Sequence, residues 1–89
     1  MNSVKSLLIS TRFPIPPCHQ KRARYIEKAI AEGAPFASLG GQRIAACPSL
    51  VRFRLGRQWR LIFREEHNTL VPHRLISRQA FDAELNRRR

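Results

Sequence analysis

The sequence predicts an α+β fold in which a small antiparallel β-sheet carries an N-terminal helix packed on one face and a short C-terminal helix. Three observations support this class. The segment from Leu50 to Arg64 alternates apolar and arginine residues around Gly56-Arg57-Gln58, which is typical of a β-hairpin. A helical spacing of apolar residues precedes this segment, and a shorter one closes the chain. At 89 residues, the chain is expected to form a single domain spanning residues 1–89.

The pairing register of the hairpin follows from its residue pattern. A three-residue loop gives three apolar pairs, Leu55 with Trp59, Phe53 with Leu61 and Val51 with Phe63. A shift of one residue would mix arginines into the apolar face, so Trp59 and Phe63 are expected in the core. The same register places Arg54 opposite Arg60, a like-charge pair that costs a few tenths to about 1 kcal/mol. An anionic partner would relieve this repulsion.

The chain before the hairpin is expected to contain one strand and one helix. Val4 to Ser10 could form a short strand, and the prolines of Phe13–Pro17 favour an extended connection after it. A helix is expected from about Cys18 to Glu32, ending at Gly33. Four apolar residues share its buried face: Ala23, Ile26, Ala29 and Ile30. Residues 34–49 are expected to be irregular, with a short helical turn near Phe36 to Leu39.

A third strand and a closing helix are expected after the hairpin. Leu70 to Ile76 is strand-like, and Pro72 requires an edge, a bulge or the first residues of that strand. Ser77 is the expected N-cap of a helix in which Phe81 and Leu85 pack on the sheet. Arg87-Arg88-Arg89 ends this helix, where cations complement the helix dipole. Ile62 is the apolar residue on the arginine face, and the closing helix or a partner protein is expected to cover it.

The charge composition points to a polyanionic partner. Lysine and arginine number 17 against 6 acidic residues, a net charge of +11, and residues 46–89 hold ten arginines and no lysine. Guanidinium groups bind phosphate in bidentate geometry, although a solvated arginine surface is the alternative explanation. On the helix expected from Cys18 to Glu32, Lys21 and Arg24 either face solvent or extend the surface that would bind nucleic acid. The expected nucleic-acid-binding residues are Arg52, Arg54, Arg57, Arg60, Arg64 and Arg74.

Several other classes of protein are disfavoured. The apolar run Leu7–Ile9 is too short for a signal-peptide core or a membrane span, so the chain is expected in the cytoplasm with no membrane partner. Cys18 and Cys47 are then expected to be reduced and buried as small hydrophobic residues. The cysteines and histidines lack the paired close spacings of zinc motifs, so no metal and no cofactor are expected.

The run Leu39–Ile44 followed by residues 50–64 resembles the RelE/ParE toxin superfamily of bacterial type II toxin-antitoxin systems, especially its compact ParE-like branch. The most specific part is the turn Leu55-Gly56-Arg57 leading into Trp59-Arg60-Leu61. The resemblance extends through Leu75-Ile76-Ser77, and residues 1–15 contribute nothing to it. It implies an antiparallel sheet with helices on one face and an exposed basic surface on the other.

The resemblance implies a toxin that inhibits growth through a basic sheet face that engages a nucleic-acid machine. RelE-like members are mRNA interferases, endonucleases that cut mRNA on the ribosome without a metal, whereas ParE-like members act on DNA gyrase and are not nucleases. Both are neutralised by a cognate antitoxin. Family resemblance does not choose between these activities. A non-catalytic nucleic-acid-binding module on the same fold is the alternative function.

If the chain is an enzyme, Arg60 and Arg78 are its candidate catalytic residues, with Arg60 stabilising the phosphate in the transition state. RNA cleavage also requires proton transfer. The ParE-like branch typically has Ser-His-Glu-x-Tyr after the last strand, whereas this chain has Ser77-Arg78-Gln79-Ala80-Phe81. Arginine and phenylalanine cannot exchange a proton near neutral pH. His67 and His73 are the remaining titratable candidates, and each is otherwise an ordinary turn or strand residue.

Overall fold

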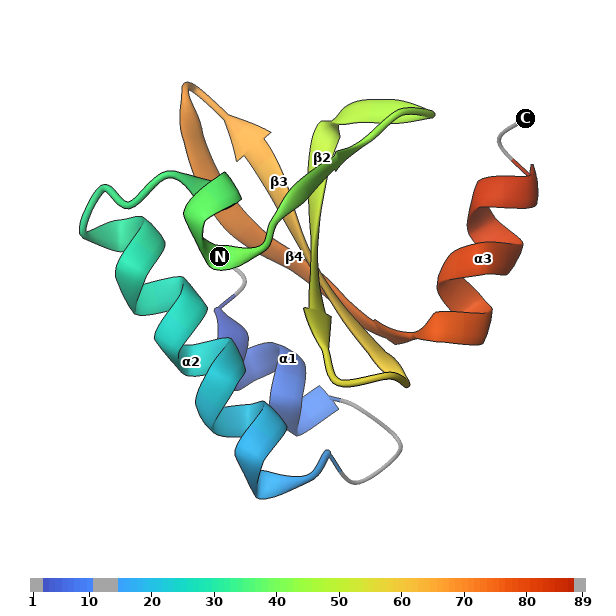
Figure 1. Cartoon of the computed structure of the whole chain (residues 1–89), viewed down its shortest axis with the longest axis horizontal. Coiled ribbons are helices and arrows are strands. Elements are labelled where there is room, and N and C mark those ends of the chain that lie inside the picture. The colour runs from blue at the N-terminus through green and yellow to red at the C-terminus, as the bar shows by residue number, and fades with distance from the viewer. Residues whose placement is uncertain (1–2, 11–14, 88–89) are drawn as a thin grey trace.

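The computed structural model describes residues 3–10 and 15–87, and their element order is that of an α+β fold (Figure 1). Helices precede and follow one antiparallel sheet with strand order β1-β2-β3-β4, so the strands form a meander. The fold class predicted from the sequence is therefore confirmed. The elements are α1 (Val4–Ser10), α2 (Pro17–Ala31), the 3₁₀ helix η1 (Phe36–Leu39), β1 (Gln42–Ile44), β2 (Cys47–Leu55), β3 (Trp59–Glu66), β4 (Thr69–Ser77) and α3 (Arg78–Arg87).

Strands β2 and β3 form the hairpin with the register that the sequence predicts. Their pairs include Leu55 with Trp59, Phe53 with Leu61, Val51 with Phe63 and Arg54 with Arg60. The apolar members face the main core, where the rings of Phe53 and Phe63 meet edge to face at 5.2 Å between centroids. The separation of apolar and arginine side chains onto two faces of the hairpin is confirmed.

Strand β1 lies in a segment that the sequence predicted to be irregular. Residues 42–44 pair with β2, which begins at Cys47 rather than at Leu50, and the register shifts after Arg43. A three-residue strand with such a shift is too short to show alternation in the sequence. Gly41 precedes it, and a Cβ at this position would lie 2.6 Å from Cε2 of Phe53, so the close approach of backbone to ring requires glycine. The predicted turn at Phe36–Leu39 is present as η1.

Strand β4 confirms the predicted third strand and explains its proline. β4 lies at an edge of the sheet, and Pro72 is opposite Phe63 beside a shift in register between Ile62 and Phe63. Pro72 therefore occupies the two settings that tolerate a missing N–H group, an edge strand and a bulge.

The predicted strand from Val4 to Ser10 is wrong, because this segment is helix α1. Val4 is fully buried, and Leu7 and Leu8 pack against the same core, which is the i, i+3, i+4 spacing of a helix face. Ile9 is 75% exposed. The carboxylate of Glu27 on α2 accepts a hydrogen bond from the Val4 N–H at 3.1 Å and so ties the two helices together. Residues 13 and 14 of the predicted connection lie outside the described residues, Pro16 is extended with φ −53° and ψ 141°, and Pro17 already belongs to α2.

Helix α2 confirms the predicted helix to within a residue at each end. It runs from Pro17 to Ala31, and its buried residues are Ala23 and Ile26. Lys21 and Arg24 are exposed on its outer side. Helices α1 and α2 lie on one face of the sheet and α3 on the other (Figure 1), so Lys21 and Arg24 do not continue the arginine surface of the hairpin.

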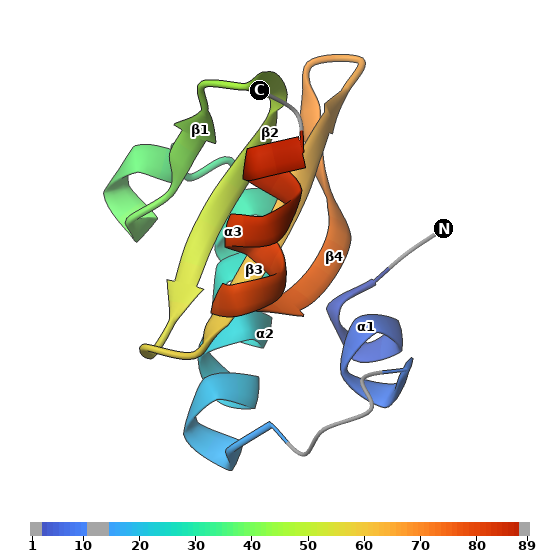
Figure 2. The same cartoon turned by 90° about the vertical axis from the view of Figure 1, so that its right-hand side faces the viewer.

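Helix α3 covers part of the arginine face, as Figure 2 shows with α3 in front of the sheet. The resemblance implied helices on one face only, and this expectation is wrong. Phe81 of α3 packs on Ile62 of β3 and Ile44 of β1, a three-residue core separate from the main one. Ile62 is 3% exposed, so its predicted cover by the closing helix is confirmed.

The start of α3 is capped as predicted. Ser77 Oγ accepts a hydrogen bond from the Ala80 N–H at 3.2 Å, which is the N-cap interaction. The predicted packing of Leu85 lies outside the described side chains, which end at residue 83. Arg88 and Arg89 also lie outside the described residues.

The two cysteines differ from their prediction as buried hydrophobic residues. Cys18 is exposed in the first turn of α2, and Cys47 is half-buried at the start of β2, opposite Ile44. Both positions are at the ends of elements, where less of the core surrounds a side chain. Within residues 3–10 and 15–87, no three His, Cys, Asp or Glu side chains gather as a metal site would require. No helix in these ranges is long and apolar enough to cross a bilayer.

Candidate anion-binding cleft

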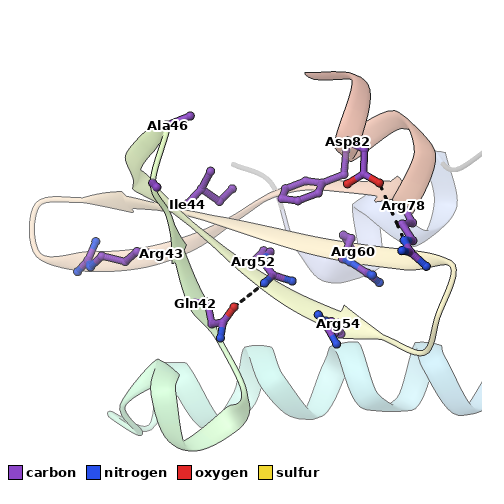
Figure 3. Close-up of a pocket in the computed structure, with 11 residues that line it drawn as sticks. Gln42, Arg43, Ile44, Ala46, Arg52, Arg54, Arg60, Arg78 and Asp82 are labelled. Atoms are coloured by element: carbon purple, nitrogen blue, oxygen red, sulfur yellow. Dashed lines mark hydrogen bonds and ion pairs between the residues drawn. The ribbon is translucent and has the colours of Figure 1, made fainter. Parts of the chain in front are cut away.

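A cleft of about 440 Å³ opens on the arginine face, between α3 and the turn that joins β1 to β2 (Figure 3). The sheet forms its floor, and its walls come from segments more than thirty residues apart in the chain. Its lining residues are Gln42, Arg43, Ile44, Ala45, Ala46, Arg52, Arg54, Arg60, Arg78, Phe81 and Asp82.

The structure brings four of the predicted site residues into this cleft: Arg52, Arg54, Arg60 and Arg78. Arg52 and Arg54 come from β2, Arg60 comes from β3 and Arg78 begins α3. Strand pairing dictates the arrangement, because Arg54 is directly opposite Arg60 and Arg52 is two residues away on the same face. The two candidate catalytic residues, Arg60 and Arg78, therefore share one site.

Three predicted nucleic-acid-binding residues do not line the cleft. Arg57 lies in the exposed β2–β3 turn, and Arg74 is exposed on the edge strand β4. Arg64 is also exposed and forms a surface ion pair with Glu66, with 3.5 Å between Arg64 Nε and Glu66 Oε1. Such pairs contribute little to stability, but this one neutralises part of the charge of Arg64.

The sequence reasoning did not identify Gln42, Arg43 and Asp82 as part of the site. The amide oxygen of Gln42 accepts a hydrogen bond from Arg52, which fixes the position of that guanidinium. Arg43 is directed away from the other four arginines (Figure 3), where it pairs with Glu65 at 3.1 Å and donates to the Pro48 carbonyl at 2.8 Å. Gln42 and Arg43 lie on β1, which pairs with β2, and Asp82 lies on α3, which packs over the sheet (Figure 2). Local sequence patterns do not show that these two elements meet at the hairpin.

Arg60 is the only charged residue buried in the part of the chain that the structure describes, with 6% of its surface exposed. Its Nη1 donates to the carbonyls of Trp59 at 2.9 Å, Gly56 at 3.3 Å and Arg57 at 3.4 Å. The guanidinium is thereby anchored to the β2–β3 turn through one nitrogen. Among the described residues, the Nε and Nη2 hydrogens have no protein acceptor and are not sealed from solvent, so they are available to a ligand in the cleft.

The electrostatic environment of Arg60 is dominated by neighbouring positive charges. Loss of hydration lowers the pKa of the Arg60 guanidinium, and the positive charges of Arg54, Arg52 and Arg78 lower it further, while Asp82 acts in the opposite direction. Asp82 is the only carboxylate in the described lining of the cleft, and its Oδ2 lies 3.9 Å from Arg78 Nε, with both side chains about 60% exposed. Within the described ranges, neither Arg54 nor Arg60 forms an ion pair with a carboxylate.

The cleft is equipped to bind an anion and poorly equipped to transfer protons. Its described lining contains no histidine, tyrosine or lysine. His67 is exposed in the β3–β4 turn and His73 is half-buried on β4, and neither lines the cleft. The arrangement can bind and neutralise a phosphate group, whereas Asp82 is its only group able to accept a proton near neutral pH.

Residues 17–83 match the family model of the ParE-like toxin domain. The match covers most of the chain, from the start of α2 into α3, and includes the whole sheet and the cleft. The chain therefore belongs to the ParE-like toxin family, within the RelE/ParE superfamily that its sequence resembles. Neither a curated protein nor a solved structure shows significant similarity to it.

Membership of this family defines the general role of the chain as the toxin of a toxin-antitoxin system. An antitoxin is the partner that the family suggests. Arg52, Arg54, Arg60 and Arg78 all lie inside the matched region, whereas α1 lies outside it.

Proposed function

We propose that this toxin acts in the cytoplasm by binding phosphate groups of a nucleic acid in the arginine cleft. The observation that carries the proposal is the convergence of Arg52, Arg54, Arg60 and Arg78 around a cleft with one carboxylate. Repulsion among these cations disfavours the unliganded arrangement, and a bound polyanion would relieve it. Arginine is also suited to phosphate, because its planar fork donates two parallel hydrogen bonds.

The composition of the cleft favours a binder of gyrase-associated DNA over a ribosome-dependent mRNA interferase. Cleavage by attack of a 2′-hydroxyl needs a proton acceptor at the nucleophile and a proton donor at the leaving oxygen. Asp82 could serve as the proton acceptor or as the proton donor, but not as both. No other described lining residue can fill the second role, since arginine stays protonated. A toxin that binds DNA within its complex with gyrase needs only the cations. A non-catalytic nucleic-acid-binding module without toxicity is the alternative function.

Induction of the chain in bacterial cells tests the toxin function directly. Growth arrest that is relieved by co-expression of the protein encoded in the adjacent reading frame supports the proposal. Unaffected growth would instead support the alternative function, a nucleic-acid-binding module without toxicity. Mapping of transcript ends and of gyrase-linked DNA breaks in the arrested cells then separates the two targets. Breaks with intact transcripts are expected. Transcripts cut at the ribosomal A site would instead identify an mRNA interferase.

The role of the cleft is tested by Arg54→Ala and Arg60→Ala in binding assays with DNA and RNA. Each variant is expected to weaken binding and to reduce the slope of log K against log salt by about one phosphate contact. Arg57→Ala is the matched control, because Arg57 lies on the adjoining turn but outside the cleft. An unchanged slope for both cleft variants would refute the role of the cleft.

A further inference from the structure

The four cleft arginines form a compact cluster rather than a row. Arg54 is opposite Arg60, and Arg52 is diagonal to Arg60 across the same two strands. Cross-strand neighbours lie about 5 Å apart and diagonal ones about 7–8 Å. Arg78 follows Ser77, which pairs with Trp59 next to Arg60. Long side chains whose Cβ atoms are spaced in this way can bring their guanidinium groups around one phosphate group, whereas a polymer backbone is followed by cations in a line.

Two arginines near the four clustered ones have their charge partly neutralised by surface ion pairs. Arg43 points away from the four clustered arginines (Figure 3). It pairs with Glu65, and Arg64 pairs with Glu66. A strand of nucleic acid lying across this face would therefore meet its highest density of positive charge in the cleft, with exposed Arg57 and Arg74 beyond it. The cleft favours a ligand whose charge is itself concentrated at one point.

The charge of the cluster matches a phosphomonoester better than a phosphodiester. The four clustered arginines and Asp82 together carry three more positive than negative charges, and Arg43 at the edge of the cleft is paired with Glu65. An internal phosphodiester carries one negative charge, whereas a phosphomonoester carries about 1.5 to 2 at pH 7 and has three acceptor oxygens. The Nε and Nη2 hydrogens of Arg60 supply a fork at the floor of the site, and Arg52 is already positioned by Gln42.

The walls of the cleft favour the end of a strand or a single nucleotide. The β1–β2 turn with Ala45 and Ala46 closes one side, and α3 with Phe81 and Asp82 closes the other (Figure 3). A volume of about 440 Å³ is in the range of small-molecule and cofactor sites. The exposed alanines leave room at the rim for a sugar and a base beside the phosphate.

We propose that the cleft is a site for one terminal phosphate group, the phosphomonoester at the end of a nucleic-acid strand or on a free nucleotide. This inference rests on the proposed function, since it specifies which phosphate the cleft binds. It assigns Arg60 as the residue at the floor that contacts the phosphate, and Arg52, Arg54 and Arg78 as the residues around it. Asp82 opposes ligand binding, because its carboxylate competes for Arg78.

The test compares oligonucleotides that differ only in one terminal group. A short single strand with a fluorophore at its 3′ end carries either a phosphate or a hydroxyl at its 5′ end, and anisotropy gives the Kd for the whole chain in phosphate-free buffer. A second pair, labelled at the 5′ end, varies the 3′ end. At least one phosphate-terminated strand is expected to bind about tenfold more tightly than its hydroxyl counterpart.

Variation of pH gives a readout that a general charge effect would not show. The second proton of a phosphomonoester dissociates near pH 6, so the advantage of the phosphate-terminated strand should grow about tenfold between pH 5 and pH 7.5. The described charged groups that line the cleft are Arg43 on β1, which is paired with Glu65, Arg52 and Arg54 on β2, Arg60 on β3, and Arg78 and Asp82 on α3. The hydroxyl-terminated strand is the control, because it reports any titration of the protein itself.

Three variants connect the effect to the cleft. Arg54→Gln should reduce the advantage of the terminal phosphate several-fold, and Arg24→Gln, exposed on α2 on the opposite side of the sheet (Figure 1), should leave it unchanged. Asp82→Asn should increase the advantage, a gain that damage to the fold would not produce. A thermal melt of each variant confirms folding.

The outcomes separate this inference from the proposed function. Equal Kd values for phosphate and hydroxyl ends would overturn the inference, while a salt slope lowered by Arg54→Gln would still support phosphate binding in the cleft. A Kd and a salt slope that do not change in Arg54→Gln would overturn both. Competition by inorganic phosphate and a nucleoside monophosphate identifies the source: strong displacement indicates a free nucleotide, and weak displacement with a clear end effect indicates a strand end.

Discussion

Replacement of Arg54 by glutamine is expected to stabilise the fold while it weakens ligand binding. Arg54 is exposed and lies directly opposite the buried Arg60, and it forms no ion pair among the described residues. Arg54→Gln therefore removes a like-charge pair without removing a described hydrogen bond. Glutamine keeps most of the length of the side chain, so packing on the strand changes little.

The expected gain can be estimated from the strand geometry. Two unit charges about 5 Å apart in a medium as polar as water repel by roughly 0.8 kcal/mol. Like charges in a directly opposite cross-strand pair are destabilising by about 0.2–1 kcal/mol. We expect a gain of about 0.5–0.8 kcal/mol in the free energy of unfolding at low ionic strength. In a domain of this size, that gain raises Tm by roughly 2–6 °C.

The assay is thermal and urea unfolding in phosphate-free buffer at about 10 mM and about 1 M NaCl. The Debye length falls from about 30 Å to about 3 Å between these conditions, so the gain should largely disappear at the higher concentration. Arg57→Gln is the matched control, because it lowers the net charge of the chain by the same amount. Arg57 lies in the turn and has no arginine opposite it.

Two results would refute this reasoning. If Arg54→Gln and Arg57→Gln shift Tm equally at low salt, the effect comes from net charge and the cross-strand pair is unimportant. If Arg54→Gln lowers Tm at both salt concentrations, the side chain makes a stabilising contact that outweighs the repulsion. In either case, the claim that ligand-free arginines oppose folding at this site fails.

Four further substitutions test the fold. Gly56→Ala is expected to cost about 1–3 kcal/mol in urea unfolding, because Gly56 has φ +71° and a Cβ there would lie 2.5 Å from Nε2 of His19. Gly33→Ala, at φ +94° with open space, should cost less, and equal costs would mean that the His19 contact is unimportant. Ser77→Ala removes the N-cap of α3 and should lower the stability of this helix by about 1 kcal/mol. Amide exchange in the first turn of α3 should become faster, and unchanged exchange would contradict the cap. Phe81→Ala should cost about 3–5 kcal/mol if α3 is part of the cooperative unit, whereas a small loss of stability with free exchange throughout α3 would show that the helix detaches independently.

The hairpin could be predicted in detail because its information is local. Alternation over two six-residue runs fixes which face each side chain occupies, and the length of the loop fixes the register. The pairing of Arg54 with Arg60 could therefore be predicted from the sequence alone. The cap at Ser77 was predictable for the same reason, since it joins residues three positions apart. The cover over Ile62 was predictable because an apolar residue on the arginine face needs one, although the contact with Phe81 joins distant segments.

The missed features depend on contacts between distant segments or on short patterns. Seven residues from Val4 to Ser10 are too few to separate helical from strand periodicity, and the burial of Val4 against the core decides in favour of α1. Strand β1 is recruited by pairing with β2, because three residues carry no periodicity of their own. Gln42 and Asp82 enter the site only because β1 pairs with the edge of the hairpin and α3 packs over its arginine face (Figure 2).

The three apolar side chains Ile44, Ile62 and Phe81 tie together the two walls and the floor of the cleft. Its width is consequently set by hydrophobic volume, independently of the residues that carry charge. A methylene added or removed at one of these three positions would move a wall relative to the guanidinium groups. Relatives with identical arginines could therefore accept ligands of different size, and comparison of their charged residues alone would not reveal the difference.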